Sequence, residues 1–379
     1  MRGAFSDEVV LAFGPMRTKT TAGGIGGDRH RSLLAWYRRH RRDLPWRRTR
    51  DPYAILVSEL MLQQTRVAVV EDRWRRFLER FPDVEALAGA SADDVLALWS
   101  GLGYYRRARQ LHAAARAIRD RHGGRVPAEA ARLRELPGVG AYTAAAVASI
   151  AFDRPEPPVD GNAARVLARW FRLRGDARSG PAARRLARRA AELVPRDGGA
   201  GEWNQALMEL GALVCLPRRP RCGACPVASS CGAAAEGRPE RYPGPGRATR
   251  PVRESVVRAA LERNGRWLLR RNGAGETPEG LFEFPALPCP SGRATPAAVA
   301  RLVERRWGWR VEDCRELGTV RHQILARSIL VRVFAARVVA GPAMPPRSAG
   351  TFRRVALSRL SELPVSGATL KIARLLARR

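Results

Sequence analysis

Four cysteines in one short window constrain this chain more than any other feature of its sequence. Cys215, Cys222, Cys225 and Cys231 are separated by six, two and five residues, and they follow a segment with helical periodicity. Four thiolates in one loop indicate a compact metal centre in a reducing compartment rather than a disulfide framework. Zinc sites more often pair two C-x-x-C units across a longer gap, whereas four thiolates in one run also suit a [4Fe–4S] cluster. The spacing alone leaves zinc and an iron–sulfur cluster open.

The segment before the cysteines has the pattern of an all-α domain. Between about residues 30 and 214, Ala, Leu and Arg recur at helical spacing, and Gly or Pro marks the breaks. One helix is predicted to begin after Asp51, a good N-cap, with an apolar stripe that continues to Val67 and Val70. Further helices are predicted near 92–99, 105–122, 141–152, 162–173, 182–194 and 202–214.

A chain of 379 residues favours two domains. We predict a flexible tail over 1–27, a helical domain over 28–233, a linker rich in Pro, Gly and Arg over 234–251, and a second domain over 252–379.

The second domain has a mixed α+β texture. Asn264-Gly265 indicates a hairpin turn between two strands, and 328–339 has the pattern of a long strand. Helices near 295–307 and 367–378 complete the predicted unit.

The charge of the chain favours a polyanionic partner. Its 68 Lys and Arg residues exceed its 36 Asp and Glu residues by 32, and a basic surface gains affinity for nucleic acid by releasing counterions. Lys occurs only at Lys19 and Lys371, so a bias toward Arg accounts for part of the excess. No apolar run approaches the ~20 residues of a membrane span. We expect a cytoplasmic, nucleoid-associated bacterial monomer that binds double-stranded DNA.

Two glycines lie in a turn between predicted helices. In Leu136-Pro137-Gly138-Val139-Gly140, they let backbone N–H groups approach a phosphate at the start of the next helix. This segment resembles a helix–hairpin–helix, and a plain tight turn between packed helices is the alternative.

Two carboxylic acids can serve a reaction near that hairpin. Asp160 begins the helix after it, where it is also a good N-cap. Glu59 lies among apolar residues, which raise a carboxyl pKa and keep a proton available, although a helix salt bridge is its alternative. Cleavage of a base–sugar bond needs a proton for the departing base and an anion beside the oxocarbenium-like sugar. The base must first leave the base stack of the duplex, because its reacting atoms are otherwise out of reach.

The cysteine spacing resembles the cluster loop of the endonuclease III superfamily of DNA glycosylases, which carries a [4Fe–4S] cluster. Four further segments, over 44–47, 58–65, 101–105 and 159–162, are similar to the MutY family of adenine DNA glycosylases within it. The similarity covers about residues 30–235. It implies an all-α helix–hairpin–helix glycosylase domain with a [4Fe–4S] cluster loop.

The resemblance also implies roles for matching residues. Glu59 would protonate adenine N7. Asp160 and Tyr142 would stabilise the cationic intermediate, and Asn162 would support Asp160. The cluster ligands would be Cys215, Cys222, Cys225 and Cys231.

Further matching residues would bind the substrate and the duplex. Trp46, Arg47 and Gln205 would line the adenine pocket. Gln64 and Tyr104 would probe the DNA stack, although from sequence alone Trp46 and Tyr104 are more typical of core aromatics. The residues expected to contact DNA are Gly138, Gly140, Gln63, Arg321 and His322.

A lysine nucleophile is missing from the expected place. Bifunctional members of the superfamily carry Lys just after the hairpin glycines, where it forms a Schiff base before the strand is nicked. This chain has Tyr142 there and no Lys between residues 20 and 370. Hydrolysis by water is therefore expected, leaving an abasic site.

The second domain is similar to the Nudix-like module with which the MutY family recognises 8-oxoguanine on the opposite strand. The segment 280–285 matches its early motif. A Nudix hydrolase needs several metal-binding carboxylates on one helix, but 295–307 offers only Glu304. Nucleotide hydrolysis is therefore not expected.

One loop departs from the family pattern. After an Arg-His pair the family commonly presents Ser or Thr, whereas Arg321-His322 is followed by Leu325 and Ala326 where that hydroxyl is expected. The departure argues against recognition of 8-oxoguanine by this loop. A plain A:G preference, or contact through His322, Arg327 or Ser328, is the alternative.

The expected function is a monofunctional adenine DNA glycosylase of base excision repair, acting on adenine opposite 8-oxoguanine or guanine. One alternative is a glycosylase for another mispaired base, such as thymine opposite guanine. Another is a non-catalytic lesion sensor, against which the presence of both Glu59 and Asp160 argues.

Overall fold

A computed structural model of the chain describes residues 25–177, 179–246, 252–290, 292, 294–324 and 327–378. The chain divides into two compact units: one comprises residues up to 63, with 83–88 and 113–248, and the other comprises 64–82, 89–112 and 249–379. Most of the predicted tail, together with Leu325 and Ala326, lies outside the described residues. Residues 25–27 of that tail begin the first helix.

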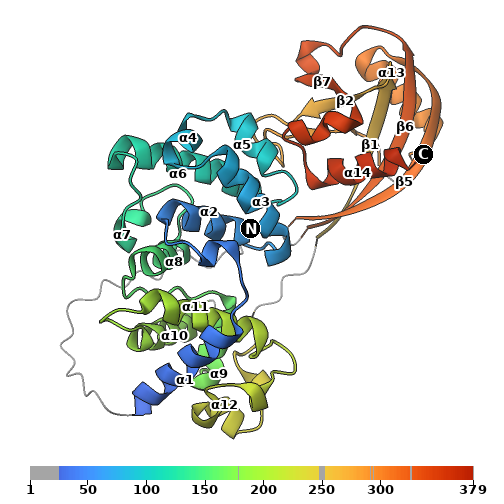
Figure 1. Cartoon of the computed structure of the whole chain (residues 1–379). Coiled ribbons are helices and arrows are strands. Elements are labelled where there is room, and N and C mark those ends of the chain that lie inside the picture. Colours follow the sequence, from blue (N-terminus) through green and yellow to red (C-terminus); the bar gives the residue numbers. More distant parts are fainter. Residues whose placement is uncertain are drawn as a thin grey trace. The chain divides into compact units, whose positions relative to one another are not determined.

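The first unit is helical, as the periodicity predicts (Figure 1). Two of its helices are supported by their first residues: Asp51 accepts hydrogen bonds from the backbone of Tyr53 and Ala54, and Asp160 accepts one from Ala163. Its elements, with α6 shared between the units, are α1 (Ile25–His40), η1 (Pro45–Arg47), α2 (Pro52–Leu62), α4 (Val84–Gly89), α6 (Arg106–His122), α7 (Ala130–Leu133), α8 (Ala141–Phe152), α9 (Gly161–Trp170), α10 (Gly180–Leu193), α11 (Ala200–Leu213), η2 (Cys222–Ala224), η3 (Ala228–Ser230), α12 (Gly232–Ala235) and η4 (Pro239–Arg241).

The prediction that one helix continues from Asp51 to Val70 is wrong. The helix α2 ends at Leu62, and α3 (Val67–Arg80) begins after a turn in which Gln64 has a φ of 56°. The apolar periodicity continues across this turn, because both helices bury a face. The break therefore leaves no mark in the hydrophobic pattern.

The helices α1, α9, α10 and α11 enclose one apolar core. Its largest side chains include Trp203 and Tyr37, both almost fully buried. Three of the cysteines, Cys215, Cys225 and Cys231, pack against the edge of this core. The cysteine loop is thus continuous with the interior of the helical unit.

The second unit is built on a seven-stranded mixed sheet. Its strand order is β3-β2-β1-β6-β5, with β4 paired to β1 and β7 to β2, and β1 runs parallel to β6 while every other pairing is antiparallel. Its elements are α3, α5 (Ala92–Leu98), β1 (Val252–Arg263), β2 (Arg266–Arg271), β3 (Phe282–Glu283), β4 (Ala286–Leu287), α13 (Pro296–Trp307), β5 (Arg310–Ile324), β6 (Arg327–Ala340), η6 (Arg347–Ala349), β7 (Phe352–Val355), η7 (Leu357–Glu362) and α14 (Gly367–Ala377).

Helices cover both faces of the sheet (Figure 1). Along β6, Val331, Val333 and Ala335 pack in a core with α14, while Phe334 and Ala336 pack in a core with α13. This period of two is what strand geometry requires of a sheet buried on both sides. The predicted hairpin at Asn264-Gly265 is present, with both residues at positive φ. The architecture agrees with the α+β unit that the sequence predicts.

The division of the chain does not follow the predicted linker alone. The segments that carry α3 and α5 lie in the helical part of the sequence but group with the sheet. Asp93 pairs with Arg271, and the hydroxyls of Ser100 and Tyr105 donate to the carbonyl of Val365. The amino-acid composition of these distant segments gives no indication that they will form such bonds. None of the described helices is long and apolar enough to span a membrane.

Candidate active site

Glu59 lies in the middle of a helix that is almost entirely buried. Nine of the eleven residues of α2 are buried, and Glu59 itself is 7% exposed. Burial raises its pKa to about 7; the charge of Asp160 adds to the rise, while a hydrogen bond from Tyr142 and the charge of Arg47 oppose it. A helix salt bridge, the alternative that the sequence left open, does not fit this environment, because Glu59 is buried. At neutral pH a large fraction of Glu59 carries the proton of a general acid.

Tyr142 lies beside that acid, in the first turn of α8. Burial and the nearby carboxylates of Glu59 and Asp160 raise its pKa well above its ordinary value. Its hydroxyl also contacts Met208 Sδ at 3.4 Å. The phenol is therefore neutral at neutral pH, and it can donate a hydrogen bond.

Asp160 is held at the start of α9 by two donors. Its Oδ1 accepts a hydrogen bond from the Ala163 N–H at 2.7 Å, and its Oδ2 accepts one from Asn162 Nδ2 at 3.0 Å. Burial raises the pKa of Asp160, and these hydrogen bonds and the charge of Arg165 work against that rise. The residue is thus an N-cap and, at the same time, a fixed carboxylate close to Glu59.

Asn162 is in turn fixed from its other side. Its Oδ1 accepts a hydrogen bond from Arg165 Nη2 at 2.8 Å, and the same Nη2 donates to the Gly211 carbonyl at 2.8 Å. A Cβ atom on Gly211 would lie 2.6 Å from Asn162 Cβ, so α11 can approach α9 this closely only because Gly211 has no side chain. The position of Asp160 therefore depends on the contact between two helices.

Arg47 is fixed by a carboxylate that the sequence analysis did not identify. The fully buried Glu209 accepts two hydrogen bonds from Arg47 at 2.9 Å each, and it also accepts bonds from the Arg42 side chain and backbone. Burial raises the pKa of Glu209, but the bonds from Arg47 and Arg42 outweigh it and bring the pKa to about 2. Glu209 lies one helical turn after Gln205 and so shares its face of α11, which is the signal that could have indicated it.

The other residues expected at the adenine pocket lie on the same unit. Trp46 is 6% exposed, and the Tyr37 hydroxyl donates to Gln205 Oε1 at 3.3 Å. The Arg47 guanidinium lies 5.6 Å from the centre of the Tyr37 ring. These contacts connect Arg47 and Gln205 to the group around Glu209, and Trp46 directly precedes Arg47 in η1. Their roles toward adenine stay predictions.

The predicted hairpin lies between α7 and α8. Gly138 has a φ of 78°, and Gly140 is the N-cap of α8, with its carbonyl accepting the first helical bond from Ala144. Gln63 Nε2 donates to Thr143 Oγ1 at 3.2 Å, so the end of α2 is tied to the same helix. The helix–hairpin–helix geometry is present, with the backbone N–H groups of the first turn of α8 at its end.

Four residues expected at the DNA belong to the second unit: Gln64, Tyr104, Arg321 and His322. Arg321 is exposed, and its carbonyl accepts a hydrogen bond from Lys371 at 2.8 Å. Burial and the charge of Lys371 lower the pKa of His322. Leu325 and Ala326, at which the loop after His322 departs from the family pattern, lie outside the described part of the chain.

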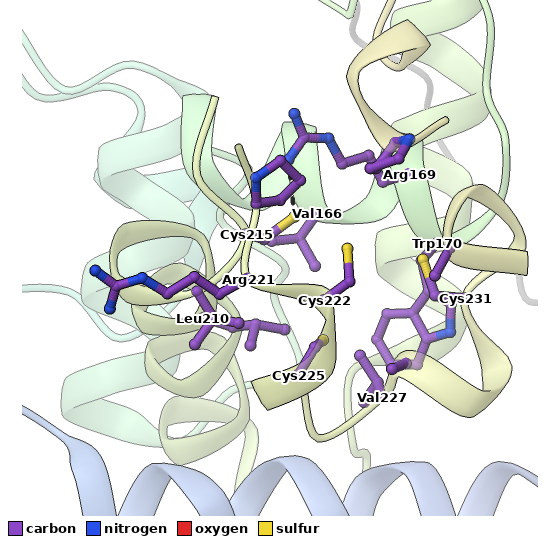
Figure 2. Close-up of a pocket in the computed structure, with 15 residues that line it drawn as sticks. Val166, Arg169, Trp170, Leu210, Cys215, Arg221, Cys222, Cys225, Val227 and Cys231 are labelled. Atoms are coloured by element: carbon purple, nitrogen blue, oxygen red, sulfur yellow. Dashed lines mark hydrogen bonds between the residues drawn. The ribbon is translucent and has the colours of Figure 1, made fainter. Parts of the chain in front are cut away.

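The four clustered cysteines line one apolar pocket (Figure 2). No three His, Cys, Asp or Glu side chains in the described residues are arranged as ligands of a metal ion. The thiols instead share the walls of a hollow with Val166, Trp170 and Val227, and Figure 2 shows their sulfur atoms around it. Four thiols that line one hollow are the donor set that an iron–sulfur cluster takes.

Two arginines of α9 hold the cysteine loop. Arg169 is 2% exposed and donates to Cys215 Sγ at 3.3 Å and to the carbonyls of Leu216 and Pro217 at 2.6 and 2.9 Å. Arg165 Nε donates to the Cys215 carbonyl at 2.7 Å. The loop is therefore attached to the helix whose N-cap is Asp160.

Two family models match the chain. The model described as HhH-GPD superfamily base excision DNA repair protein matches residues 57–196, and the model of the iron-sulfur binding domain of endonuclease III matches residues 215–231. The cofactor of this chain is therefore a [4Fe–4S] cluster, which decides between the two metals that the spacing alone left open.

Curated relatives decide the family. The adenine DNA glycosylase of Mycolicibacterium smegmatis is 44% identical over 235 residues, which cover 60% of this chain and 79% of that protein. The chain belongs to the adenine DNA glycosylase family. Rat adenine DNA glycosylase is 47% identical over 226 residues, and the chain spans less than half of the length of that relative.

A solved structure supports the assignment of the helical fold. A thermostable thymine-DNA glycosylase has a TM-score of 0.50 and 33% identity, and the match covers 55% of this chain and 98% of that one. The regions that the two family models match contain the hairpin and the cysteine loop, both of which the sequence identifies. In this member of the adenine DNA glycosylase family, Glu59, Tyr142 and Asp160 lie together. Glu209, Arg42 and Arg165 also contribute to the site region, and the sequence analysis did not identify them.

Proposed function

We propose that this chain is a monofunctional adenine DNA glycosylase of base excision repair. The observation that carries the proposal is the buried Glu59, whose pKa is about 7, facing Tyr142 and Asp160 in a chain of the adenine DNA glycosylase family. The substrate would be adenine opposite guanine or 8-oxoguanine, and the product an abasic site.

The first step is protonation of the departing base. Glu59 gives its proton to adenine N7 while the bond between N9 and the sugar C1′ breaks, and the bonding electron pair remains with the base. Adenine then leaves as a neutral molecule instead of as an anion. Positioned general acids of this kind contribute about 10²- to 10⁴-fold to a rate.

The second step is capture of the sugar cation by water. Asp160, fixed by Ala163 and Asn162, presents its carboxylate to the positive charge that develops at C1′. The Tyr142 hydroxyl, neutral because of its raised pKa, adds a dipole on the same side. Water bonds to C1′ and loses its proton to the carboxylate of Glu59, which regenerates the acid. These two steps need no lysine side chain.

We propose that the chain binds double-stranded DNA as a monomer, and the surroundings of the site support the binding to DNA. The hairpin at Gly138 and Gly140 ends at the N-terminus of α8, which suits a backbone phosphate. The cysteine loop exposes Arg218, Arg219 and Arg221. When bound, the cluster supplies a rigid support for this loop. A cytoplasmic location at the nucleoid follows from this substrate.

The test is base release from a panel of duplexes with single mispairs. We expect adenine release from A:8-oxoguanine and A:G pairs, with the strand left uncut until alkali is added. Trapping of a covalent adduct by borohydride, or release of a different base, would contradict the proposal.

Asp160→Asn separates catalysis from binding. The substituted amide keeps the size of the side chain but loses the negative charge, so turnover should fall by several orders of magnitude while duplex affinity is kept. A matched control is Asp153→Asn in the same unit, whose carboxylate accepts bonds from the Gly199 and Gly201 backbone instead. Turnover by Asp160→Asn at the wild-type rate would exclude the catalytic role of Asp160, whereas a wild type that binds the duplexes without releasing a base would be a lesion sensor.

A second candidate is a glycosylase for thymine opposite guanine. The observation in its favour is the likeness to the solved thymine-DNA glycosylase at 33% identity. The same duplex panel distinguishes it, since it would release thymine and spare adenine.

A further inference from the structure

Two turns of the second unit carry strained residues at the positions expected to probe the DNA stack. Gln64 has a φ of 56° and Tyr104 a φ of 48°. This left-handed conformation is unfavourable for a residue with a side chain, and such a residue keeps it only where its surroundings impose it. Contacts with residues outside each turn must therefore hold Gln64 and Tyr104 in this conformation.

Arg107 bonds to both turns. It lies in the first turn of α6, is 6% exposed, and its Nη2 donates to Thr65 Oγ1 at 3.1 Å. The same nitrogen lies 3.1 Å from the carbonyl of Gly103 and 3.3 Å from that of Leu102. Thr65 directly follows Gln64, and Gly103 directly precedes Tyr104. One nitrogen atom therefore joins the two turns.

The face of the same guanidinium supports the Tyr104 ring. Its central carbon lies 5.4 Å from the centre of that ring and 5.5 Å from the centre of Trp99, whose Nε1 also donates to the Gly103 carbonyl at 3.2 Å. Burial lowers the pKa of Arg107 to about 10, so it is still charged at neutral pH. A charged plane that stacks on a ring and bonds to oxygens at its edge is a property of Arg that Lys lacks.

We propose that Arg107 is a positioning residue that sets Gln64 and Tyr104 as one wedge for opening the duplex. The inference rests on the proposed function, because it concerns how the target base leaves the stack before Glu59 acts. Arg107 touches neither the base nor the sugar in this assignment. Its substitution therefore affects the extrusion of the base and not the breaking of the glycosidic bond.

The test compares a paired adenine with an unpaired one. Single-turnover release is measured for adenine opposite guanine and for adenine opposite a tetrahydrofuran abasic analogue, which needs little opening. Arg107→Met should slow the first reaction on the order of 10- to 100-fold, as for loss of hydrogen bonds to a charged group, and the second only a few-fold. Arg107→Lys should behave like Arg107→Met. Arg116→Met, which removes an exposed arginine from the same helix, is the matched control and should affect both duplexes equally.

Extrusion is measured separately with 2-aminopurine in place of adenine, whose fluorescence rises when it leaves the stack. The wild type should show the rise, and Arg107→Met should show a slower or smaller one. Thr65→Val, which removes only the hydroxyl acceptor beside Gln64, should shift both readouts in the same direction and serves if Arg107→Met does not fold. Combining Arg107→Met with Tyr104→Ala should cost little more than Tyr104→Ala alone.

Three results would overturn the inference: equal losses on paired and unpaired adenine, additive effects of Arg107→Met and Tyr104→Ala, or unchanged fluorescence in Arg107→Met. Failure of the proposed function is distinguishable. It would appear as a wild type that releases no adenine from either duplex, while the dependence of 2-aminopurine fluorescence on Arg107 would still support the inference.

Discussion

The proposed role of Glu59 makes the activity of this chain depend on pH, because the proposed reaction uses its proton. Its pKa of about 7 predicts that single-turnover base release falls as pH rises above 7, approaching tenfold per pH unit. At low pH the rate should fall again as Asp160, whose pKa is also raised, becomes protonated. Rates measured between pH 4.5 and 9 check both limbs. An alkaline rate that stays constant up to pH 9 would exclude Glu59 as the acid.

The same residue should reduce the stability of the folded protein. Its pKa is about 7 when folded and about 4.5 when unfolded, so the folded state binds the proton more tightly. Stability is then lost as pH rises from 4.5 to 7 and stays lost above 7, by about 3 kcal/mol for a shift of this size. Glu59→Gln should therefore unfold at a higher urea concentration than the wild type at pH 8, with a smaller difference at pH 5. An equal difference at both pH values would contradict this prediction.

Single residues were predictable where their local neighbours carry the signal. Glu59 stands out because apolar residues surround it in sequence, and Asp160 because it begins a helix. The pairing of Glu209 with Arg47 has no such local signal, since 162 positions separate the two residues and a bidentate ion pair forms only once the chain has folded. Arg107 is a further case, because one arginine among many is distinguished only by its burial.

At the scale of elements, the contact between α9 and α11 depends on Gly211. Gly211→Ala would bring a methyl group to 2.6 Å from Asn162 Cβ and 3.0 Å from its backbone, so the two helices must move apart. We expect a loss of about 1–3 kcal/mol in stability, as for overpacking, and a fall in the rate at saturating DNA because Asp160 moves with α9. Calorimetry and single-turnover kinetics measure the two effects.

Gly89→Ala is the matched control for that substitution. Gly89 ends α4, and an added Cβ there meets nothing within 4 Å. Gly89→Ala should leave the rate of base release unchanged and the stability of the fold equal or slightly higher. If Gly211→Ala behaved in the same way, the proposed dependence of Asp160 on this contact would be excluded.

The helices themselves followed from the sequence more completely than their ends did. The helices predicted near 141–152 and 202–214 are observed as α8 and α11, because an apolar stripe with Gly at the breaks determines them locally. The turn at Gln63–Arg66 was missed because it contains neither Gly nor Pro. There the tertiary contacts of Thr65 and Gln64 override a helical pattern.

At the scale of the whole molecule, the cluster should matter for DNA before it matters for folding. Arg169 holds the cysteine loop through the carbonyls of Leu216, Pro217 and Tyr242, which do not depend on the cluster. Cys222→Ala should therefore lower iron content and weaken duplex binding by about tenfold or more, on the scale of losing two or three phosphate contacts, while the urea midpoint changes little. Iron analysis, binding by anisotropy and circular dichroism check this. Unfolding of the helical unit together with iron loss would show that the cluster is required for the fold.

The division into two units was the least predictable property. Composition placed a boundary at the Pro- and Gly-rich linker, yet α3 and α5 group with the sheet through pairs such as Arg271 with Asp93. Both partners of such a pair are ordinary surface charges in the sequence. Composition identifies where a chain has little structure of its own, but it carries no information about which distant segments will meet.

Arg165 donates to the carbonyl of Cys215 and to Asn162, and Asn162 donates to Asp160. Three bonds thus connect the cofactor loop to the Asp160 carboxylate. The loop is not a detachable module appended to a complete catalytic domain. In evolutionary terms, a lineage could discard its cysteines and keep Asp160 in place only if the backbone of the loop still presented the carbonyl of residue 215 to Arg165.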